Sequence, residues 1–273
     1  MSSLNQLDGR MTAVQGPSTR SFAIARSIPR WRVGLLGIIL LATLIAAIGH
    51  DRIEQQQAYH AFADDRQILG VPNLFDVASN LPFLIVGALG VALCLGHRRP
   101  PAAACWATVF VGTALVSFGS ACYHWAPSDT TLAWDRLPMA LAFMALLIAL
   151  VAEHVGEGLE RFMLAPALAV GVFSVFWWRW TGDLRFYLWV QFTPLLCIPI
   201  VLVLFAPRYT HRRYLVYGLG LYALAKFAEI ADRDVFSLTS QILSGHTLKH
   251  LLAAAAVFAL LVMLWRRSPV VAK

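Results

Sequence analysis

Charged residues are scarce in this chain of 273 residues. Asp, Glu, Lys and Arg together make up 14% of it, against about 25% in an average soluble domain. Apolar residue types make up 59%. A soluble globule of this size could not bury that much apolar surface, and a disordered chain would contain far less of it. The composition therefore predicts a polytopic membrane protein that lies in a lipid bilayer.

Cysteine is also rare, and its four copies lie inside or at the ends of apolar runs. They are Cys94, Cys105, Cys122 and Cys197. This placement excludes a disulfide framework and favours small buried hydrophobic residues. Basic residues outnumber acidic ones, which gives a formal net charge of +7. They lie between the apolar runs and form no patch with exposed aromatic residues, so we expect no nucleic-acid partner.

Eight apolar runs are long enough to cross a bilayer as helices. They cover residues 33–49, 77–95, 103–124, 135–152, 162–178, 186–205, 214–230 and 245–265. The predicted fold class is an all-α polytopic membrane bundle, because open strands have no hydrogen-bond partners in lipid and the runs lack the alternation of a barrel. We expect a seven-helix core at 73–266, preceded by one extra N-terminal transmembrane helix at 33–49. Residues 1–32 are polar and basic and predict a mobile cytoplasmic tail.

The distribution of Lys and Arg predicts the orientation of these helices. Most of the 22 basic residues fall in the tail, in alternate loops and at the C-terminus, while the other loops carry more acids. Lys and Arg are enriched in cytoplasmic loops, so both termini are predicted to be cytoplasmic.

Five polar residues are then predicted to lie at one membrane depth. Ser120 and His124 are four residues apart at the end of the third run, and Asp135 opens the fourth after a ten-residue loop. His246 and His250 are four apart at the start of the eighth run, so they share a helix face. By the predicted topology, all five belong to the non-cytoplasmic leaflet.

Three imidazoles suit a catalytic zinc ion, because they leave one tetrahedral position open. The metal would lower the pKa of a bound water toward ~7 and polarise a carbonyl. Asp135 is the natural general base, or a residue that orients a ligand. Ser120 can donate a hydrogen bond to a developing oxyanion.

Each residue also has a structural interpretation. A lone histidine at a helix end is usually an interfacial or hydrogen-bonded residue. Asp135 could cap the fourth helix, and Ser120 could bond to its own helix. The combination favours a site, since five polar groups at one depth are otherwise a large cost.

Two lysines near these residues are expected to have structural roles. Lys226 and Glu229 are three residues apart, which favours an ion pair at the interface with a snorkelling lysine over a contact with the substrate. Lys249 is turned about 100° away from its neighbour His250 around the helix, which predicts that it faces the interface.

The pattern of Ser120, His124, Asp135, His246 and His250 resembles the alkaline ceramidase family. That family belongs to a seven-helix superfamily that includes the adiponectin receptors. The stretch 73–81, Asn-Leu-Phe-Asp-Val-Ala-Ser-Asn-Leu, is similar to the family's entry into its first core helix. The resemblance covers about residues 73–265.

This resemblance implies a zinc-dependent hydrolase that cleaves the amide bond of ceramide-like N-acyl lipids within the membrane, giving a sphingoid base and a fatty acid. His124, His246 and His250 match the family's zinc ligands. Ser120 and Asp135 match its catalytic serine and aspartate. A receptor-like or structural zinc protein on the same scaffold is the alternative. A transporter is disfavoured, because inverted repeats and a chain of mid-membrane acids are missing.

One departure from the family concerns calcium. Members with a calcium site carry an acidic Asp-Trp-x-Glu-x-Asn motif and a Glu at the entry to the first core helix. That motif is absent here, and Asn73 stands at the Glu position. The departure speaks against a calcium ion. It leaves Asp64, Asp65, Asn73 and Asp76 as the region where a second metal or a lipid head group would approach.

Overall fold

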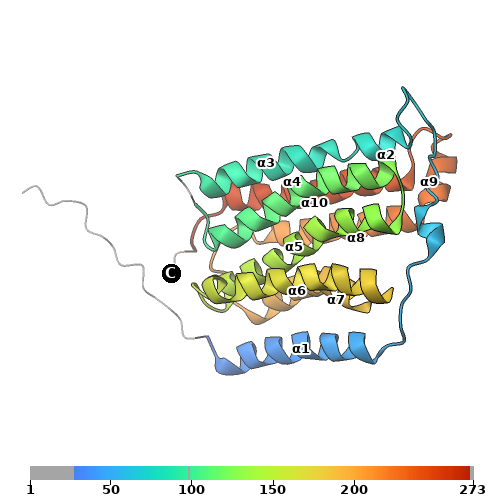
Figure 1. Cartoon of the computed structure of the whole chain (residues 1–273). Helices are drawn as coiled ribbons and strands as arrows, with labels where there is room; N and C mark the ends of the chain where they lie inside the picture. Colours follow the sequence, from blue (N-terminus) through green and yellow to red (C-terminus); the bar gives the residue numbers. More distant parts are fainter. Residues whose placement is uncertain (1–27, 98, 271–273) are drawn as a thin grey trace, which may run out of the picture.

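The computed structural model describes residues 28–97 and 99–270, and within them the chain is helical with no β-strand. The long helices are α1 (Arg30–Gly49), α3 (Leu81–Leu95), α4 (Ala103–Trp125), α5 (Asp129–His154), α6 (Glu160–Thr181), α7 (Arg185–Leu204), α8 (Arg213–Ile230) and α10 (Gly245–Arg266). Short helices are η1 (Gln57–His60), α2 (Leu74–Ala78) and α9 (Asp232–Leu238). Residues 1–27 of the predicted tail lie outside the described residues (Figure 1).

The predicted membrane bundle is confirmed in fold class. Seven helical segments are long and apolar enough to cross a membrane, with α2 and α3 counted together as one. An eighth segment qualifies only as the pair of α8 and α9, which are bent by 83° relative to each other. The sequence analysis did not predict α9, because the acidic start of this helix ends the apolar run before it. Each of the eight predicted runs therefore lies on a helix that the structure shows.

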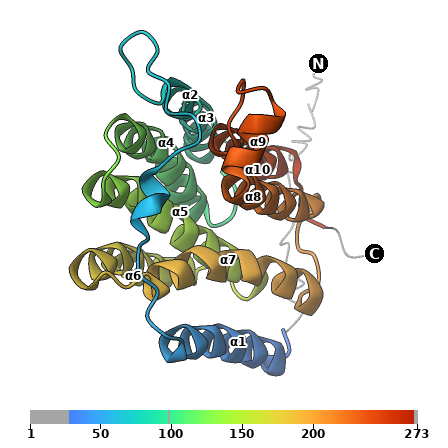
Figure 2. The ribbon, with the colours of Figure 1, turned by 90° about the vertical axis from the view of Figure 1, so that its right-hand side faces the viewer.

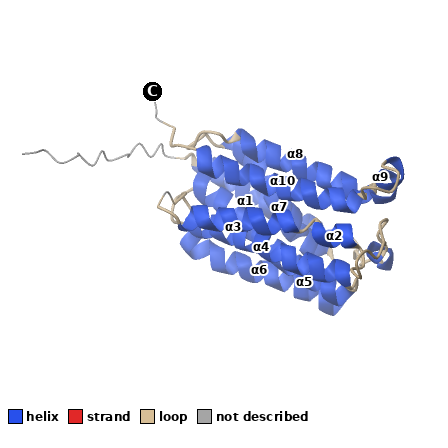
Figure 3. Cartoon of the chain, turned by 90° about the horizontal axis from the view of Figure 1, so that it is seen from above, coloured by secondary structure: helices blue, strands red, loops and turns tan. Residues whose placement is uncertain are grey.

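The helices lie roughly side by side with their long axes aligned (Figure 3). The central helix is α5, which packs against α4, α6 and α7, while α10 packs against α8 and α3. The first helix, α1, lies at the edge of the bundle against α7 (Figures 1 and 2). Arg185, at the start of α7, donates hydrogen bonds to the carbonyls of Ile48 and His50 at the end of α1. The additional helix is thus attached to the core at one end of α7.

Helix α5 begins earlier than the sequence predicted. It starts at Asp129, because the hydroxyl of Ser128 accepts a hydrogen bond from the backbone N–H of Thr131 and caps the helix. The expected ten-residue loop before Asp135 is therefore wrong, and so is the alternative that Asp135 caps the fourth helix. Asp135 therefore lies well inside α5, more than one turn after the start of the helix.

Two glycines allow the helices that carry the polar residues to pack closely. A Cβ atom on Gly119 would lie 2.3 Å from the carbonyl oxygen of Trp134, so α4 contacts the backbone of α5 there. A Cβ atom on Gly245 would lie 2.2 Å from the carbonyl oxygen of Ala228, so α10 starts against the end of α8. Close backbone contact through small residues is a common way for membrane helices to pack. Each glycine directly precedes a predicted site residue, Ser120 or His246.

Candidate metal centre and lipid cavity

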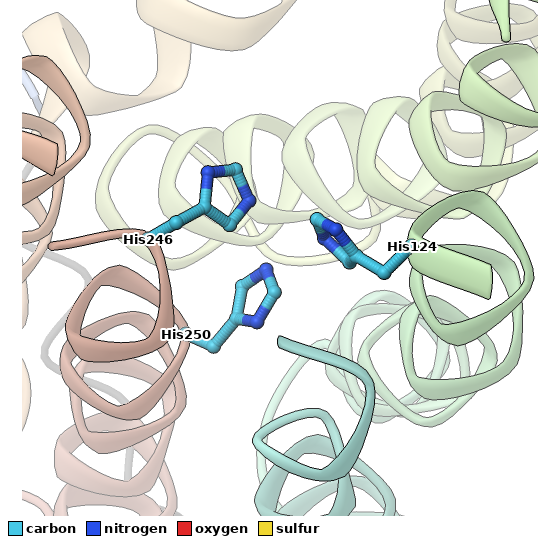
Figure 4. Close-up of side chains that lie close together, drawn as sticks. All are labelled: His124, His246 and His250. Carbon is cyan, nitrogen blue, oxygen red and sulfur yellow. The ribbon is translucent and has the colours of Figure 1, made fainter. Parts of the chain in front are cut away.

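Three histidine side chains meet at one end of the bundle. His124 comes from the last turn of α4, and His246 and His250 come from the first two turns of α10 (Figure 4). One nitrogen from each ring lies within 4.8 Å of the others. The ring centroid of His124 lies 4.7 Å from that of His246 and 4.9 Å from that of His250. All three residues are buried, so the structure brings together the histidines that the spacing placed in one leaflet.

The state of His124 shows that this cluster fits a metal ion. Both of its ring nitrogens are buried and have no hydrogen-bond partner. A buried polar nitrogen without a partner costs free energy, and a metal ligand bond is one way to satisfy it. Three neutral imidazoles are a typical donor set for catalytic zinc. The donor chemistry therefore fits zinc better than calcium, which prefers oxygen ligands.

Each histidine is held by a group from another part of the chain. Nδ1 of His250 lies 2.8 Å from the hydroxyl of Ser79. The backbone N–H of His246 donates to Oδ1 of Asp232 at 2.7 Å. The amide nitrogen of Asn73 donates to the backbone carbonyl of His124 at 2.7 Å. Such contacts fix the orientation of metal ligands in known metal sites.

The four residues of the proposed second region serve different purposes. Asn73 supports His124, and the buried carboxylate of Asp76 accepts hydrogen bonds from the hydroxyls of two residues of α10's first turn, Ser244 and Thr247. The guanidinium of Arg66 pairs with Asp64, with the two closest atoms 2.6 Å apart.

Asp65, the fourth, is exposed. Among the described residues, these acids form no second group of three potential metal ligands.

A large cavity lies directly beside the histidines. Its volume is about 560 Å³, and Ser120, Asp135 and His250 line it. The rest of its wall is mainly apolar, including Phe83, Val109, Met139, Phe143, Leu146, Val257 and Leu260. Ser120 is buried and Asp135 is half-buried, so the cavity gives both side chains access to a ligand. A long apolar chain would fit here with its polar end near the histidines.

The cavity also contains a charged cluster from α8 and α10. The carboxylate of Glu229 pairs with Lys226, and with Lys249 at 3.0 Å. The ammonium of Lys249 also lies 2.7 Å from Nε2 of His246. The prediction that Lys249 faces the interface is wrong, because its side chain extends to Glu229 and is only 16% exposed. The predicted pair of Lys226 and Glu229 is confirmed, and both residues lie on the cavity wall.

The segment between α1 and α2 covers this end of the bundle (Figure 2), and the sequence analysis assigned no role to its residues Tyr59 and Phe62. Its Phe62 ring packs against His124 and His246, with centroids 4.6 and 4.9 Å apart. Its Tyr59 hydroxyl donates to Glu229 at 2.9 Å. Burial raises the pKa of Tyr59 well above its ordinary value, and the carboxylate of Glu229 acts in the same direction. Tyr59 therefore keeps its proton and can donate it in a hydrogen bond.

Comparison with known families gives one match. The model of the ceramidase family matches residues 71–268, which is well over half of the chain and contains all five predicted site residues. The extra helix α1 and the segment with Tyr59 and Phe62 precede the matched region. Curated proteins gave no match to the sequence.

Proposed function

Because the chain belongs to the ceramidase family, which implies a hydrolase that acts on a lipid, we propose that it is a zinc-dependent amidase within the membrane. Its proposed substrates are ceramide-like N-acyl lipids, which it cleaves to a sphingoid base and a fatty acid. Its long apolar helices are consistent with a multi-pass membrane protein.

One observation carries the zinc proposal. His124 has two buried, unpartnered ring nitrogens beside His246 and His250, and His250 lines an apolar cavity of about 560 Å³. We therefore assign His124, His246 and His250 as the residues that would hold the ion. When bound, zinc lowers the pKa of a water molecule and polarises a carbonyl.

Asp135 and Ser120 are proposed to carry the remaining chemistry. The carboxylate of Asp135 accepts a proton from the attacking water and passes it to the amide nitrogen as the carbon–nitrogen bond breaks. The hydroxyl of Ser120 donates a hydrogen bond to the carbonyl oxygen as negative charge develops on it. Water thus adds its hydroxyl to the acyl carbon and its proton to the leaving amine, which balances the reaction.

The cavity explains how a lipid would be oriented. Its apolar wall, from Val109 on α4 to Leu260 on α10, is suited to hydrocarbon, while Ser120, Asp135 and His250 are among the polar residues that line it. A lipid tail in the bilayer is already surrounded by hydrocarbon, so the apolar wall accepts it without cost and supplies little net hydrophobic driving force. The polar groups of the cavity therefore decide where the amide lies. From the distribution of Lys and Arg, we place this end of the bundle on the non-cytoplasmic side.

A single preparation can test the proposal. The protein is purified in detergent, its zinc content is measured by elemental analysis, and its turnover is measured on ceramides and other N-acyl lipids by mass spectrometry of the released fatty acid. We expect about one zinc ion per chain and turnover that a chelator abolishes and added zinc restores. Zinc without turnover on any N-acyl lipid would favour the receptor-like or structural alternative. Turnover without zinc would contradict the metal assignment.

A further inference from the structure

Arg136 follows Asp135 on α5 and lies buried in the cavity wall, 7% exposed. Aromatic rings surround its guanidinium. The central carbon of that group lies 4.2 Å from the ring centroid of Trp178, 4.9 Å from that of Tyr187 and 5.8 Å from that of Tyr59. Such contacts stabilise a cation and hold its planar group in one orientation.

The guanidinium is only partly satisfied by protein atoms. Its Nη2 donates to Oε1 of Gln55 at 2.7 Å. Its Nη1 is buried and has no hydrogen-bond partner. No carboxylate among the described residues forms an ion pair with Arg136. A buried charge without an opposite charge is costly, so this arrangement indicates that a ligand supplies the anion.

The acids that line the cavity do not neutralise Arg136. Glu229 is paired with two lysines, Lys226 and Lys249. Asp135 precedes Arg136 in the chain and is assigned to proton transfer above. A third acid on the cavity wall, Glu54, pairs with Arg52. None of these three acids forms an ion pair with Arg136, so an anionic group on a ligand can be its partner.

We propose that Arg136 binds an anionic oxygen group, a carboxylate or a group of similar shape, on the lipid that occupies the cavity. The guanidinium presents its donors as a fork that matches such a group. Because this inference takes the cavity as the lipid site, it rests on the proposed function in that respect. The anion comes either from the head group of an acidic N-acyl lipid or from the fatty acid that hydrolysis releases.

Matched pairs of lipids distinguish these sources. N-oleoylglycine and N-oleoylethanolamine share one acyl chain and differ in the head-group carboxylate. Oleate and oleyl alcohol differ in the carboxylate of the chain itself. Each lipid is titrated into the purified protein in detergent, and the rise in thermal stability is followed. The concentration that gives half of the maximal rise measures binding. Turnover is measured separately for the two amides.

Arg136→Gln is the test variant, and Arg179→Gln is its matched control. Arg179 also lies beside Trp178, but it is exposed and outside the cavity wall. We expect wild type and Arg179→Gln to prefer the carboxylate member of at least one pair. Loss of a charge-assisted hydrogen bond should weaken that preference about 10- to 100-fold in Arg136→Gln. Arg136→Lys keeps the positive charge but not the paired donors of the guanidinium, so it should retain part of the preference for the carboxylate. This variant replaces Arg136→Gln in the test if Arg136→Gln does not fold.

The outcomes separate this inference from the proposed hydrolase. A preference for N-oleoylglycine alone identifies a head-group anion, and a preference for oleate alone identifies the released acid. Equal binding within both pairs, or a preference that survives Arg136→Gln unchanged, overturns the role of Arg136. Turnover of N-oleoylethanolamine in that case leaves the hydrolase intact. A carboxylate preference without turnover supports Arg136 and argues against the hydrolase.

Discussion

His246 is the most direct residue at which to test the metal assignment. It shares the cluster with His124 and His250, and its ring also lies close to Lys249. Removal of one imidazole leaves two protein ligands, which bind zinc poorly because a catalytic zinc site needs three. We expect His246→Ala to lose most of its zinc in elemental analysis. His97→Ala, at an exposed histidine outside the cluster, is the control and should keep its zinc. Full occupancy in His246→Ala would disprove the assignment.

Asp135 separates a hydrolase from a receptor-like protein. Asp135→Asn keeps the shape and most of the hydrogen-bonding capacity of the side chain but removes the basic oxygen. If Asp135 moves the proton, turnover of an N-acyl sphingoid lipid should fall roughly 10²–10⁴-fold while zinc content and thermal stability stay near wild type.

The control for Asp135→Asn is Asp129→Asn in the first turn of the same helix. Asp129 contacts Gln57 and His60 and lies outside the cavity wall, so this change should cost at most about 1 kcal/mol of stability and keep turnover. An unchanged rate in Asp135→Asn, with active wild type, would refute the proposed mechanism.

At the scale of elements, the contact of α4 with α5 positions Ser120 and Asp135 on one cavity. Gly119 makes this contact possible, because any Cβ there would overlap the backbone at Trp134. We expect Gly119→Ala to force the helices apart, with a loss of about 1–3 kcal/mol of stability and a large loss of turnover. Gly220→Ala in α8 is the matched control, since its Cβ would meet nothing within 4 Å. It should be neutral or slightly stabilising, because alanine favours helix. Equal thermal stability of the two variants would contradict the packing argument.

The elements also show what the sequence could predict. The apolar runs located every membrane helix, because lipid requires long apolar segments with internally satisfied backbones. The start of α5 was missed, because residues 129–134 are mixed in polarity and the signal lay in the capping residue Ser128. The meeting of His124 with His246 and His250 followed from i, i+4 spacing and the alternation of helix direction.

The side-chain contacts between distant elements could not be predicted in the same way. Lys249 was placed by its angle around α10, but a long flexible side chain reaches well beyond its own helix face. The environment of Arg136 combines α5 with Trp178 of α6, Tyr187 of α7 and Tyr59 of the preceding segment. The periodicity of a single segment does not predict this group of aromatic rings around Arg136. The one local signal in the sequence was an arginine directly after Asp135 in an apolar run, because a charged residue there is costly.

For the whole molecule, the two ends of the bundle make an orientation test possible. The histidine end holds the segment with Gln57 and His60, which contact Asp129. At the far end of α10, Ser268 bonds to Thr210 of the segment between α7 and α8. Because the long helices run from one end to the other, the two ends should lie on opposite sides of the membrane. From the excess of Lys and Arg, the end with Thr210 and Ser268 should be cytoplasmic.

A reporter of compartment fused after Lys273 should therefore report the cytoplasm, and one inserted near Asp129 should report the opposite side. A second insertion after Leu69, which is 93% exposed in a turn between α1 and α2, should agree with the one near Asp129 and guards against disruption of α5. Reversal of all three signals would leave the bundle intact and move the proposed active site to the cytoplasmic leaflet. If all three reporters lie on one side of the membrane, the two ends of the bundle do not face different compartments. This result would also contradict the topology that placed Ser120, His124, Asp135, His246 and His250 in one leaflet.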